Sequence, residues 1–123
     1  MTASDAKILV VDDEFQVRAL LQRVLDLEGY TTLSAANADD ALTMLDREPV
    51  DLILLDLRMP GPLDGEELLF ALRDTGNDVP IIVISAWVDE EVLADQPDCV
   101  HAVLKKPLQL TELCSTVRDA LHA

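Results

Sequence analysis

The sequence is poor in basic residues, in cysteine and in long apolar runs. Nine Lys and Arg residues stand against 24 Asp and Glu residues, so the 123-residue chain carries a formal net charge of −15 at pH 7. A chain this acidic repels a phosphate backbone instead of releasing its counterions. We therefore expect no direct binding of nucleic acid.

The scarcity of long apolar runs and of cysteine excludes further classes. No apolar stretch approaches the roughly 20 residues that span a bilayer, and residues 1–7 lack both the basic and the apolar segment of a secretory signal. Cys99 and Cys114 have no paired spacing and no His cluster, which favours two reduced, buried thiols over a disulfide or a zinc site. We expect one cytoplasmic, non-membrane domain over residues 1–123, long enough for a core.

What the chain does have is a regular alternation of apolar runs and helical periodicity. The runs predict strands at about 7–11, 31–35, 51–56, 80–85 and 101–104, and the first, third and fourth are apolar on consecutive positions, as in strands covered on both faces. Apolar residues at three-and-four spacing predict helices. These stripes are Val17, Leu20, Leu21 and Val24; Ala38, Ala41, Leu42 and Leu45; and Leu110, Leu113, Cys114, Val117 and Leu121.

Helix boundaries agree with this interpretation. A glycine or proline follows each of the first three helices, at Gly29, Pro49 and Gly76. Asp64 with Glu67 resembles a capping box that opens the third helix, and Pro97 restricts the segment 88–99 to a short or distorted fourth helix. The alternation predicts an α/β fold, with a doubly wound five-stranded parallel sheet and five helices on its two faces.

Three of the predicted strands end in charged residues. Asp12 and Asp13 follow the first strand, Asp56 ends the third, and Lys106 follows the fifth. In parallel sheets, ligands bind beyond the carboxyl ends of the strands. The three carboxylates would form a negative pocket that needs a proton or a cation, and an all-oxygen site of this kind suits Mg²⁺.

The same pocket can support phosphoryl chemistry. A carboxylate can attack phosphorus to give an acyl phosphate, and Asp56, alone at the end of the central run, is the best-placed nucleophile. Lys106 would supply a second positive charge, and the Ser85 hydroxyl would donate a hydrogen bond to a phosphoryl oxygen. Lys106 is preferred to Lys105 because it directly precedes Pro107.

Structural alternatives remain open for several of these residues. Asp12 or Asp13 could cap the first helix, because Asp is a preferred N-cap residue. The Ser85 hydroxyl could likewise cap the helix that follows it. His101 and Trp87 are interpreted as packing residues, and Lys105 as a solvated neighbour of Lys106.

Over essentially its full length the chain resembles the receiver domain of two-component response regulators, which are CheY-like proteins. The resemblance rests on the order and spacing of five motifs: Val-Val-Asp-Asp-Glu at 10–14, Asp-Leu-Ile-Leu-Leu-Asp-Leu-Arg-Met-Pro-Gly at 51–61, Asp64-Gly65, Ser85-Ala86 and Lys106-Pro107. It implies a flavodoxin-like three-layer sandwich with strand order 2-1-3-4-5. It also implies that Asp56 accepts phosphate from a partner histidine kinase or histidine phosphotransfer protein.

The resemblance assigns further roles at the site. Asp13, Asp56 and the backbone carbonyl of Arg58 would ligate Mg²⁺, with Asp12 acting mainly through water. Ser85 and Lys106 would sense the phosphate, and the Lys106-Pro107 peptide bond would be cis. A downstream protein target or a fused output domain would read the phosphorylated state.

Three positions depart from the family pattern. Val103 stands where relatives usually carry an aromatic switch residue, so an aromatic switch is not expected there, and His101 or Trp87 are alternatives for another rearrangement. The loop 59–65 is one residue longer than usual and has an extra proline. The segment 96–100 replaces an Ala/Gly-rich turn, which affects the face of the fourth helix.

Our leading hypothesis is a phosphorylation-controlled signalling module, which catalyses only its own phosphorylation and dephosphorylation and acts through protein binding. An aspartate-nucleophile phosphatase is disfavoured, because such enzymes need a second acid where Arg58 stands. A receiver-like scaffold that works without phosphorylation is the third hypothesis. We also expect Arg58 and Trp87 to tune the lifetime of the phosphate, and the sequence leaves open whether the chain stands alone or is part of a longer protein.

Overall fold

The sheet has the predicted strands and the predicted order. The computed structural model describes residues 6–56, 68, 71–72, 79–85 and 100–122, and of Ser85 it describes the backbone. Five parallel strands form one sheet in the order β2-β1-β3-β4-β5. They are β1 (Lys7–Val11), β2 (Thr31–Ala35), β3 (Leu52–Asp56), β4 (Ile81–Ser85) and β5 (Val100–Lys105), and each bound lies within one residue of the prediction.

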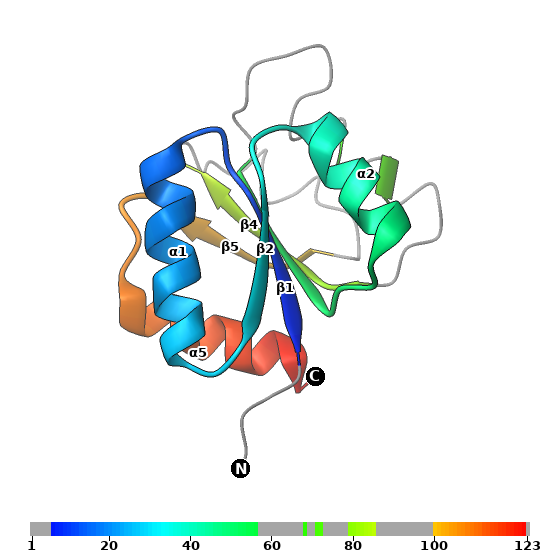
Figure 1. The fold of residues 1–123 in the computed structure, drawn as a ribbon. Helices are drawn as coiled ribbons and strands as arrows, with labels where there is room; N and C mark the ends of the chain where they lie inside the picture. Colours follow the sequence, from blue (N-terminus) through cyan, green and yellow to red (C-terminus); the bar gives the residue numbers. More distant parts are fainter. Residues whose placement is uncertain (1–5, 57–67, 69–70, 73–78, 86–99, 123) are drawn as a thin grey trace.

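Helices cover both faces of this sheet, which gives the three-layer sandwich that the resemblance implied (Figure 1). α1 (Phe15–Leu27) and α5 (Leu110–Leu121) lie on one face, and α2 (Ala38–Arg47) lies on the other. These three helices confirm three of the five predicted. The capping box at Asp64 and Glu67, the helix stop at Gly76 and the segment 88–99 lie outside the described residues. Within the described ranges, no helix is long and apolar enough to span a membrane.

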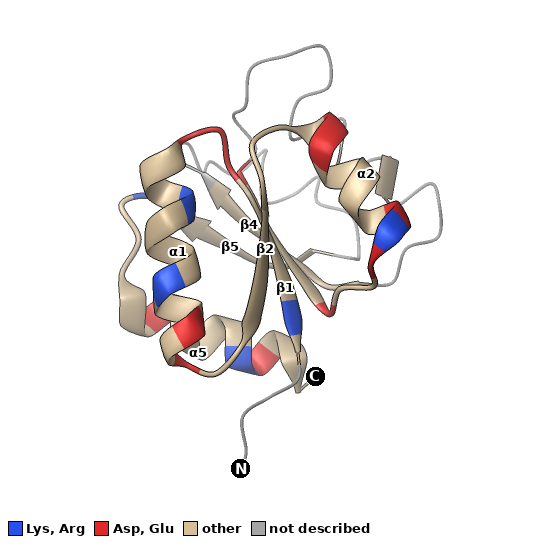
Figure 2. Cartoon of the chain, viewed as in Figure 1, with Lys and Arg blue, Asp and Glu red and all other residues tan. Residues whose placement is uncertain are grey.

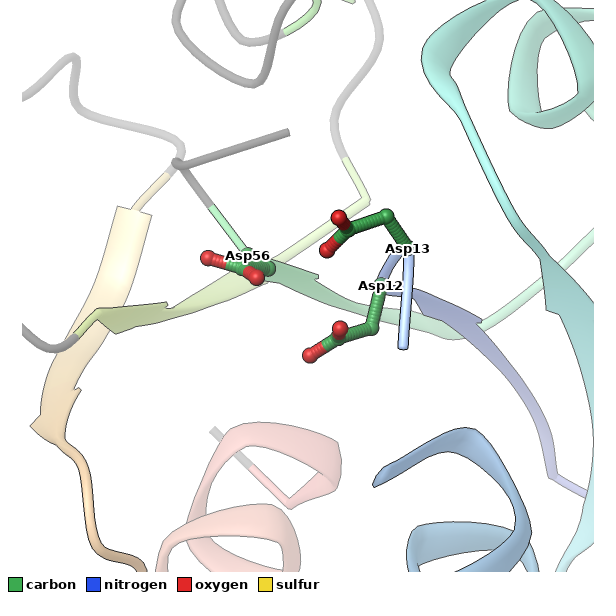
Figure 3. Close-up of side chains that lie close together, drawn as sticks. All are labelled: Asp12, Asp13 and Asp56. Atoms are coloured by element: carbon green, nitrogen blue, oxygen red, sulfur yellow. The ribbon is translucent and has the colours of Figure 1, made fainter. Parts of the chain in front are cut away.

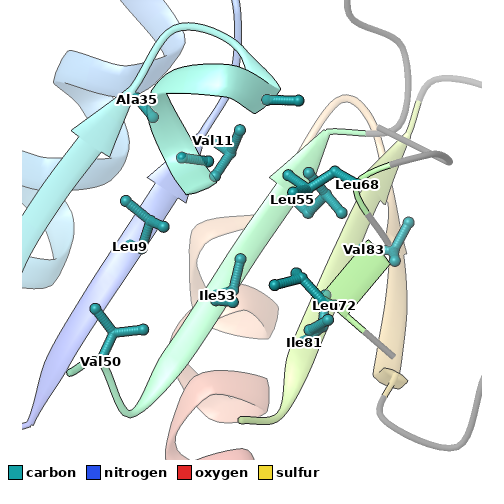
Figure 4. Close-up of a cluster of buried hydrophobic side chains, with 12 residues drawn as sticks. Leu9, Val11, Ala35, Val50, Ile53, Leu55, Leu68, Leu72, Ile81 and Val83 are labelled. Atoms are coloured by element: carbon teal, nitrogen blue, oxygen red, sulfur yellow. The ribbon is translucent and has the colours of Figure 1, made fainter. Parts of the chain in front are cut away.

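The core consists of two clusters that share the strands. Consecutive strand residues point to opposite faces, so Leu9 and Ile53 pack toward α2 while Ile8 and Leu52 pack toward α1 and α5. Figure 4 shows the cluster on the α2 side, which also contains Leu68. Every residue of β3 is buried. The consecutive apolar positions in the sequence therefore reflect burial on both faces, as predicted.

The first helix ends where the sequence predicted. Gly29 has a φ angle of 94°, in the left-handed region that glycine adopts without strain. The Gly29 N–H donates to the carbonyl of Asp26 at 3.0 Å and the Tyr30 N–H donates to the carbonyl of Leu25 at 3.1 Å. These two bonds form a Schellman motif, which satisfies the carbonyls left free at the helix end.

Three details of the sequence interpretation were wrong. Leu20 was assigned to the apolar stripe of α1 but is 49% exposed, because the buried stripe runs through Leu21 and Leu25 instead. His101, interpreted as a packing residue, is exposed on β5, an edge strand. Cys114 is a free thiol as expected, but it is half-buried. Cys99 and Trp87 lie outside the described residues.

Val103 is partly buried and packs against the core cluster on the α2 side. Its side chain is short and branched at Cβ, so it has one strongly preferred rotamer and no ring to swing between core and surface. The structure thus places an ordinary packing residue at the position where relatives usually carry an aromatic one.

Candidate functional site

The predicted site residues lie at the carboxyl ends of the two central strands. In the parallel pair of β1 and β3, Val11 is opposite Leu55. The next residues along the chain are Asp12, which directly follows β1, and Asp56, which is the last residue of β3. From β1 the chain continues to β2 on one side and then returns to β3 on the other side of β1. The direction in which strands are added to the sheet therefore reverses between β1 and β3. This is the position at which open α/β sheets bind ligands.

Asp12 and Asp56 are buried, and one lysine bridges them. The two residues are 1% and 4% exposed, the only buried charged residues in the part of the chain that the structure describes. The Lys106 Nζ donates to Asp12 Oδ2 and to Asp56 Oδ2, each at 3.2 Å. Burial by itself lowers the pKa of Lys106, but the charges of Asp56 and Asp12 outweigh it and raise that pKa above its ordinary value of 10.5. The lysine is therefore charged at neutral pH.

Asp12 is fixed by its backbone as well. Its N–H donates to the Ala35 carbonyl of β2 at 3.2 Å, and its carbonyl accepts from Arg18 Nη1 of α1 at 2.7 Å. Its Oδ1 accepts from the Glu14 N–H at 2.9 Å, which is an Asx turn. The alternative that Asp12 or Asp13 caps the first helix is wrong, because the N-cap residue of α1 is Glu14 and the helix has no side-chain cap hydrogen bond. The second carboxylate oxygen of Asp12 binds Lys106.

Asp13 completes a group of three carboxylates. Figure 3 shows Asp12 and Asp13, just beyond β1, on the same side as Asp56 at the end of β3. One oxygen from each carboxylate can be chosen so that all three lie within 4.8 Å of one another. An octahedral Mg²⁺ with oxygens at about 2.1 Å spaces its ligands by about 3 to 4 Å, so small side-chain movements would bring these atoms into its shell.

The charges of the group also fit a divalent cation. Among the described residues, the three carboxylates outnumber the one ammonium that contacts them, that of Lys106. The donors are all oxygen atoms, which Mg²⁺ prefers over nitrogen and sulfur. The residues present therefore fit a bound Mg²⁺.

The two lysines at the end of β5 are placed differently. Lys105 is the last residue of the strand, opposite Ser85, and is exposed, whereas Lys106 turns back to the carboxylates. The Lys106-Pro107 peptide bond is cis, as the resemblance implied. Of the other predicted site residues, Ser85 ends β4 next to β3, and only its backbone is described. Arg58 and the loop 59–65 lie outside the described residues.

Sequence reasoning missed one residue at this site, Arg18. Its guanidinium contacts the backbone of Asp12 and lies 5.8 Å from the centroid of the Phe15 ring. The available signal was spacing: a cation six residues after Asp12, on the helix that follows it, is within reach of the loop between them.

These features define the class of the protein, a parallel α/β domain whose switch point holds clustered carboxylates bridged by a lysine. The chain belongs to the response regulator receiver domain family, whose model matches residues 8–118.

Individual relatives agree with this assignment. The chain is 33% identical over 116 residues to sporulation initiation phosphotransferase F of Bacillus subtilis, with 94% of this chain and 93% of the relative aligned. It is 41% identical over 118 residues to the response regulator MprA of Mycobacterium ulcerans, with 94% of this chain but only 50% of MprA aligned. The structure of the response regulator TrrA of Thermotoga maritima in complex with Mg(2+)-BeF matches with a TM-score of 0.83 and 32% identity, covering 94% of this chain and 99% of TrrA.

Proposed function

We propose that Asp56 is the phosphoacceptor of this receiver domain and that its donor is a phosphohistidine on a sensor histidine kinase or a histidine phosphotransfer protein. The observation that carries the proposal is the Asp56 carboxylate itself. It is 4% exposed, stands at the carboxyl end of a fully buried strand, and shares Lys106 with Asp12. A carboxylate in this position is held for chemistry, because burying it for stability alone is unfavourable.

The transfer is a substitution at phosphorus. An Asp56 carboxylate oxygen attacks the phosphorus, the bond between phosphorus and the donor's imidazole nitrogen breaks, and that nitrogen keeps the electron pair. The product is an acyl phosphate on Asp56 and a neutral imidazole once a proton is taken up. The pocket's contribution is to position the carboxylate and to place positive charge near the phosphoryl oxygens.

The carboxylates of Asp12, Asp13 and Asp56 would hold Mg²⁺, together with the backbone carbonyl of Arg58 that the family resemblance adds. When bound, the metal neutralises the charge that develops on the transferring phosphoryl group. The all-oxygen donor set of three neighbouring carboxylates supports this assignment. The relative TrrA, solved in complex with Mg(2+)-BeF, gives it further support.

Lys106 and Ser85 would answer the new charge on Asp56. Lys106 already divides its hydrogen bonds between Asp12 and Asp56, so a phosphoryl oxygen can draw it from one partner without leaving it unpaired. Ser85 ends β4, and the residue before it in the chain, Ile84, is opposite Asp56 in the sheet. We assign the Ser85 hydroxyl the role of donating a hydrogen bond to a phosphoryl oxygen on Asp56.

The output of this chemistry is protein binding. We propose that the domain has no substrate other than its phosphodonor and catalyses only its own phosphorylation and dephosphorylation. A downstream protein or a fused output domain reads the phosphorylated surface, in the cytoplasm where the kinase acts. Val103 packs in the core and lacks a ring, so the surface change must use other residues than an aromatic switch at this position.

The test is phosphorylation by a small phosphodonor with Mg²⁺, followed by the mass of the intact protein. The wild type should gain one phosphoryl group that is stable in acid and lost in base, and Asp56→Asn should gain none. Asp51→Asn is the matched control, because Asp51 immediately precedes the same strand at its other end, is exposed, and accepts a hydrogen bond from the Lys7 N–H that Asn can also accept. A phosphoryl group retained in Asp56→Asn, or none in the wild type from either a small donor or a kinase, contradicts the proposal.

A further inference from the structure

Asp12 is held at all four of its polar atoms. Its N–H, Oδ1 and Oδ2 are paired with Ala35, Glu14 and Lys106 at 3.2, 2.9 and 3.2 Å. The shortest of the four contacts is the one at its carbonyl oxygen, which accepts from Arg18 Nη1 at 2.7 Å. Arg18 thus joins the first turns of α1 to the backbone immediately before Asp13.

Asp13 is held quite differently. It is exposed, and within the described part of the chain its carboxylate has no hydrogen-bond or ion-pair partner. Its carboxylate nevertheless lies close enough to those of Asp12 and Asp56 to share a cation. Its position therefore depends on the backbone that carries it.

The carbonyl that Arg18 contacts belongs to the peptide unit between Asp12 and Asp13. This unit is planar, so fixing the Asp12 oxygen also fixes the direction of the Asp13 N–H and with it the start of the Asp13 residue. A charged donor makes a shorter and stronger hydrogen bond than a neutral one. Arg18 is well suited to hold this peptide plane.

We propose that Arg18 is a positioning residue for the cation site: its guanidinium orients the Asp12–Asp13 peptide, so that the Asp13 carboxylate is held ready to bind Mg²⁺. This inference rests on the proposed magnesium role of the three carboxylates. Arg18 does not touch the metal, and its effect is transmitted through one peptide unit.

The positioning role and the charge of Arg18 predict opposite changes in Mg²⁺ affinity when Arg18 is removed. A guanidinium is a positive charge, and by Coulomb's law alone its removal should strengthen the binding of another cation nearby. If Arg18 acts by positioning, its removal should weaken Mg²⁺ binding instead. The direction of the change therefore separates the two effects.

Phe15 favours the positioning role, because it restricts where the guanidinium can go. Its ring lies one helical turn before Arg18 and within cation–π range of it, at 5.8 Å from the ring centroid to Arg18 Cζ. A long side chain held between an aromatic ring and a backbone carbonyl loses much of its rotamer freedom. The hydrogen bond to Asp12 is then better preorganised.

The experiment is a calorimetric titration of the intact, metal-free protein with Mg²⁺ in the absence of any phosphodonor. Arg18→Met keeps the length and helix propensity of the side chain and should weaken Mg²⁺ binding about tenfold, as loss of groups that orient metal ligands usually does. Arg23→Met is the control, because Arg23 is on the same helix, is exposed, and loses the same charge. Its affinity should stay within about twofold of the wild type, since exposed charges are screened. Arg18→Lys keeps a donor and should recover part of the affinity.

Unfolding by urea, measured on the same samples, separates loss of the fold from loss of positioning. Arg18→Met is expected to remain folded, and if it does not, Arg18→Gln provides the same comparison. Mg²⁺ affinity in the folded variant that equals or exceeds that of the wild type overturns the positioning role while leaving the proposed function intact. A wild type that binds no Mg²⁺ at all overturns both.

Discussion

Each end of the sheet has a lysine paired with acidic residues, but the acidic side chains are buried at the carboxyl end and exposed at the amino end. At the carboxyl end, Lys106 is 20% exposed and meets two carboxylates, Asp12 and Asp56, whose side chains are 2% and 5% exposed, at 3.2 Å each. At the amino end, Lys7 pairs with Glu48 at 3.9 Å, with side chains 39% and 47% exposed. Figure 2 shows acidic residues at both ends.

The comparison shows that burial, and not residue type, distinguishes the site from an ordinary charged surface. An exposed ion pair contributes little to the free energy of unfolding, because water stabilises the two charges about as well when the pair is broken. Among the described residues, the carboxyl end places two buried carboxylates and the exposed Asp13 around one ammonium, so carboxylates outnumber ammonium groups there. Such an arrangement weakens the folded state unless a cation binds, and this is why we attribute it to function.

The largest difference should come from removing the lysine at each end. Lys106→Met removes the ammonium that bridges two buried carboxylates and should lower the free energy of unfolding by about 2 kcal/mol without Mg²⁺. Lys7→Met should lower it by less than about 0.5 kcal/mol. Urea unfolding in a chelator, repeated with Mg²⁺, measures both. Mg²⁺ should restore stability to Lys106→Met more than to Lys7→Met, and equal losses at the two ends would remove the distinction between them.

At alkaline pH, Lys106→Met and Lys7→Met should differ by a smaller amount in the free energy of unfolding. The folded state raises the pKa of Lys106 and so holds its proton more tightly than the unfolded state does. The stability that this proton contributes is fully present below the ordinary pKa of 10.5 and is lost as pH rises through the higher, folded value. Above about pH 10, the wild type and Lys7→Met should therefore lose stability more steeply than Lys106→Met.

The wild type and Lys7→Met are the controls for this titration. Burial also raises the pKa values of Tyr30 and Cys114, and all variants share the resulting loss of stability at high pH. The relevant quantity is the difference in slope between Lys106→Met and the other two proteins, measured by urea unfolding across the alkaline range. Parallel slopes for all three would show that the buried pairs do not stabilise the fold.

The smallest effect is expected for the acid at the amino end. Glu48→Gln removes one exposed charge and should change the free energy of unfolding by less than about 0.5 kcal/mol, at low and at high salt alike. Because the chain carries a net charge of −15, the change should be slightly stabilising at low salt. A loss above 1 kcal/mol would mean that the amino end also holds a strained charge cluster.

The sequence predicted the sheet well because each strand's signal is local. Runs such as Leu52 to Leu55 are apolar on consecutive positions only when both faces are covered, and Gly29 marks a helix end because it takes a positive φ angle there. The strand order required the family resemblance, since no local pattern encodes which strands are neighbours. Leu20 shows the limit of periodicity: Leu20 and Leu21 are adjacent leucines, and only packing decides which one is buried.

The sequence predicted the carboxylates and the lysine of the site, but it did not predict the residue that contacts the Asp12 backbone. Asp12, Asp56 and Lys106 end or follow predicted strands, so their meeting follows from parallel topology. Arg18 was missed because its role is a contact to a backbone carbonyl, for which any long donor on the helix would qualify.

The most direct test of the central claim is the identity of the phosphorylated residue. After phosphorylation with a small donor and Mg²⁺, borohydride reduces an aspartyl phosphate to homoserine, which peptide sequencing locates. We predict homoserine at position 56 and aspartate at positions 12 and 13. Homoserine at Asp12 or Asp13, or at an exposed acid of the amino end such as Asp51, would contradict the assignment of the buried carboxylate at the end of β3 as the phosphoacceptor.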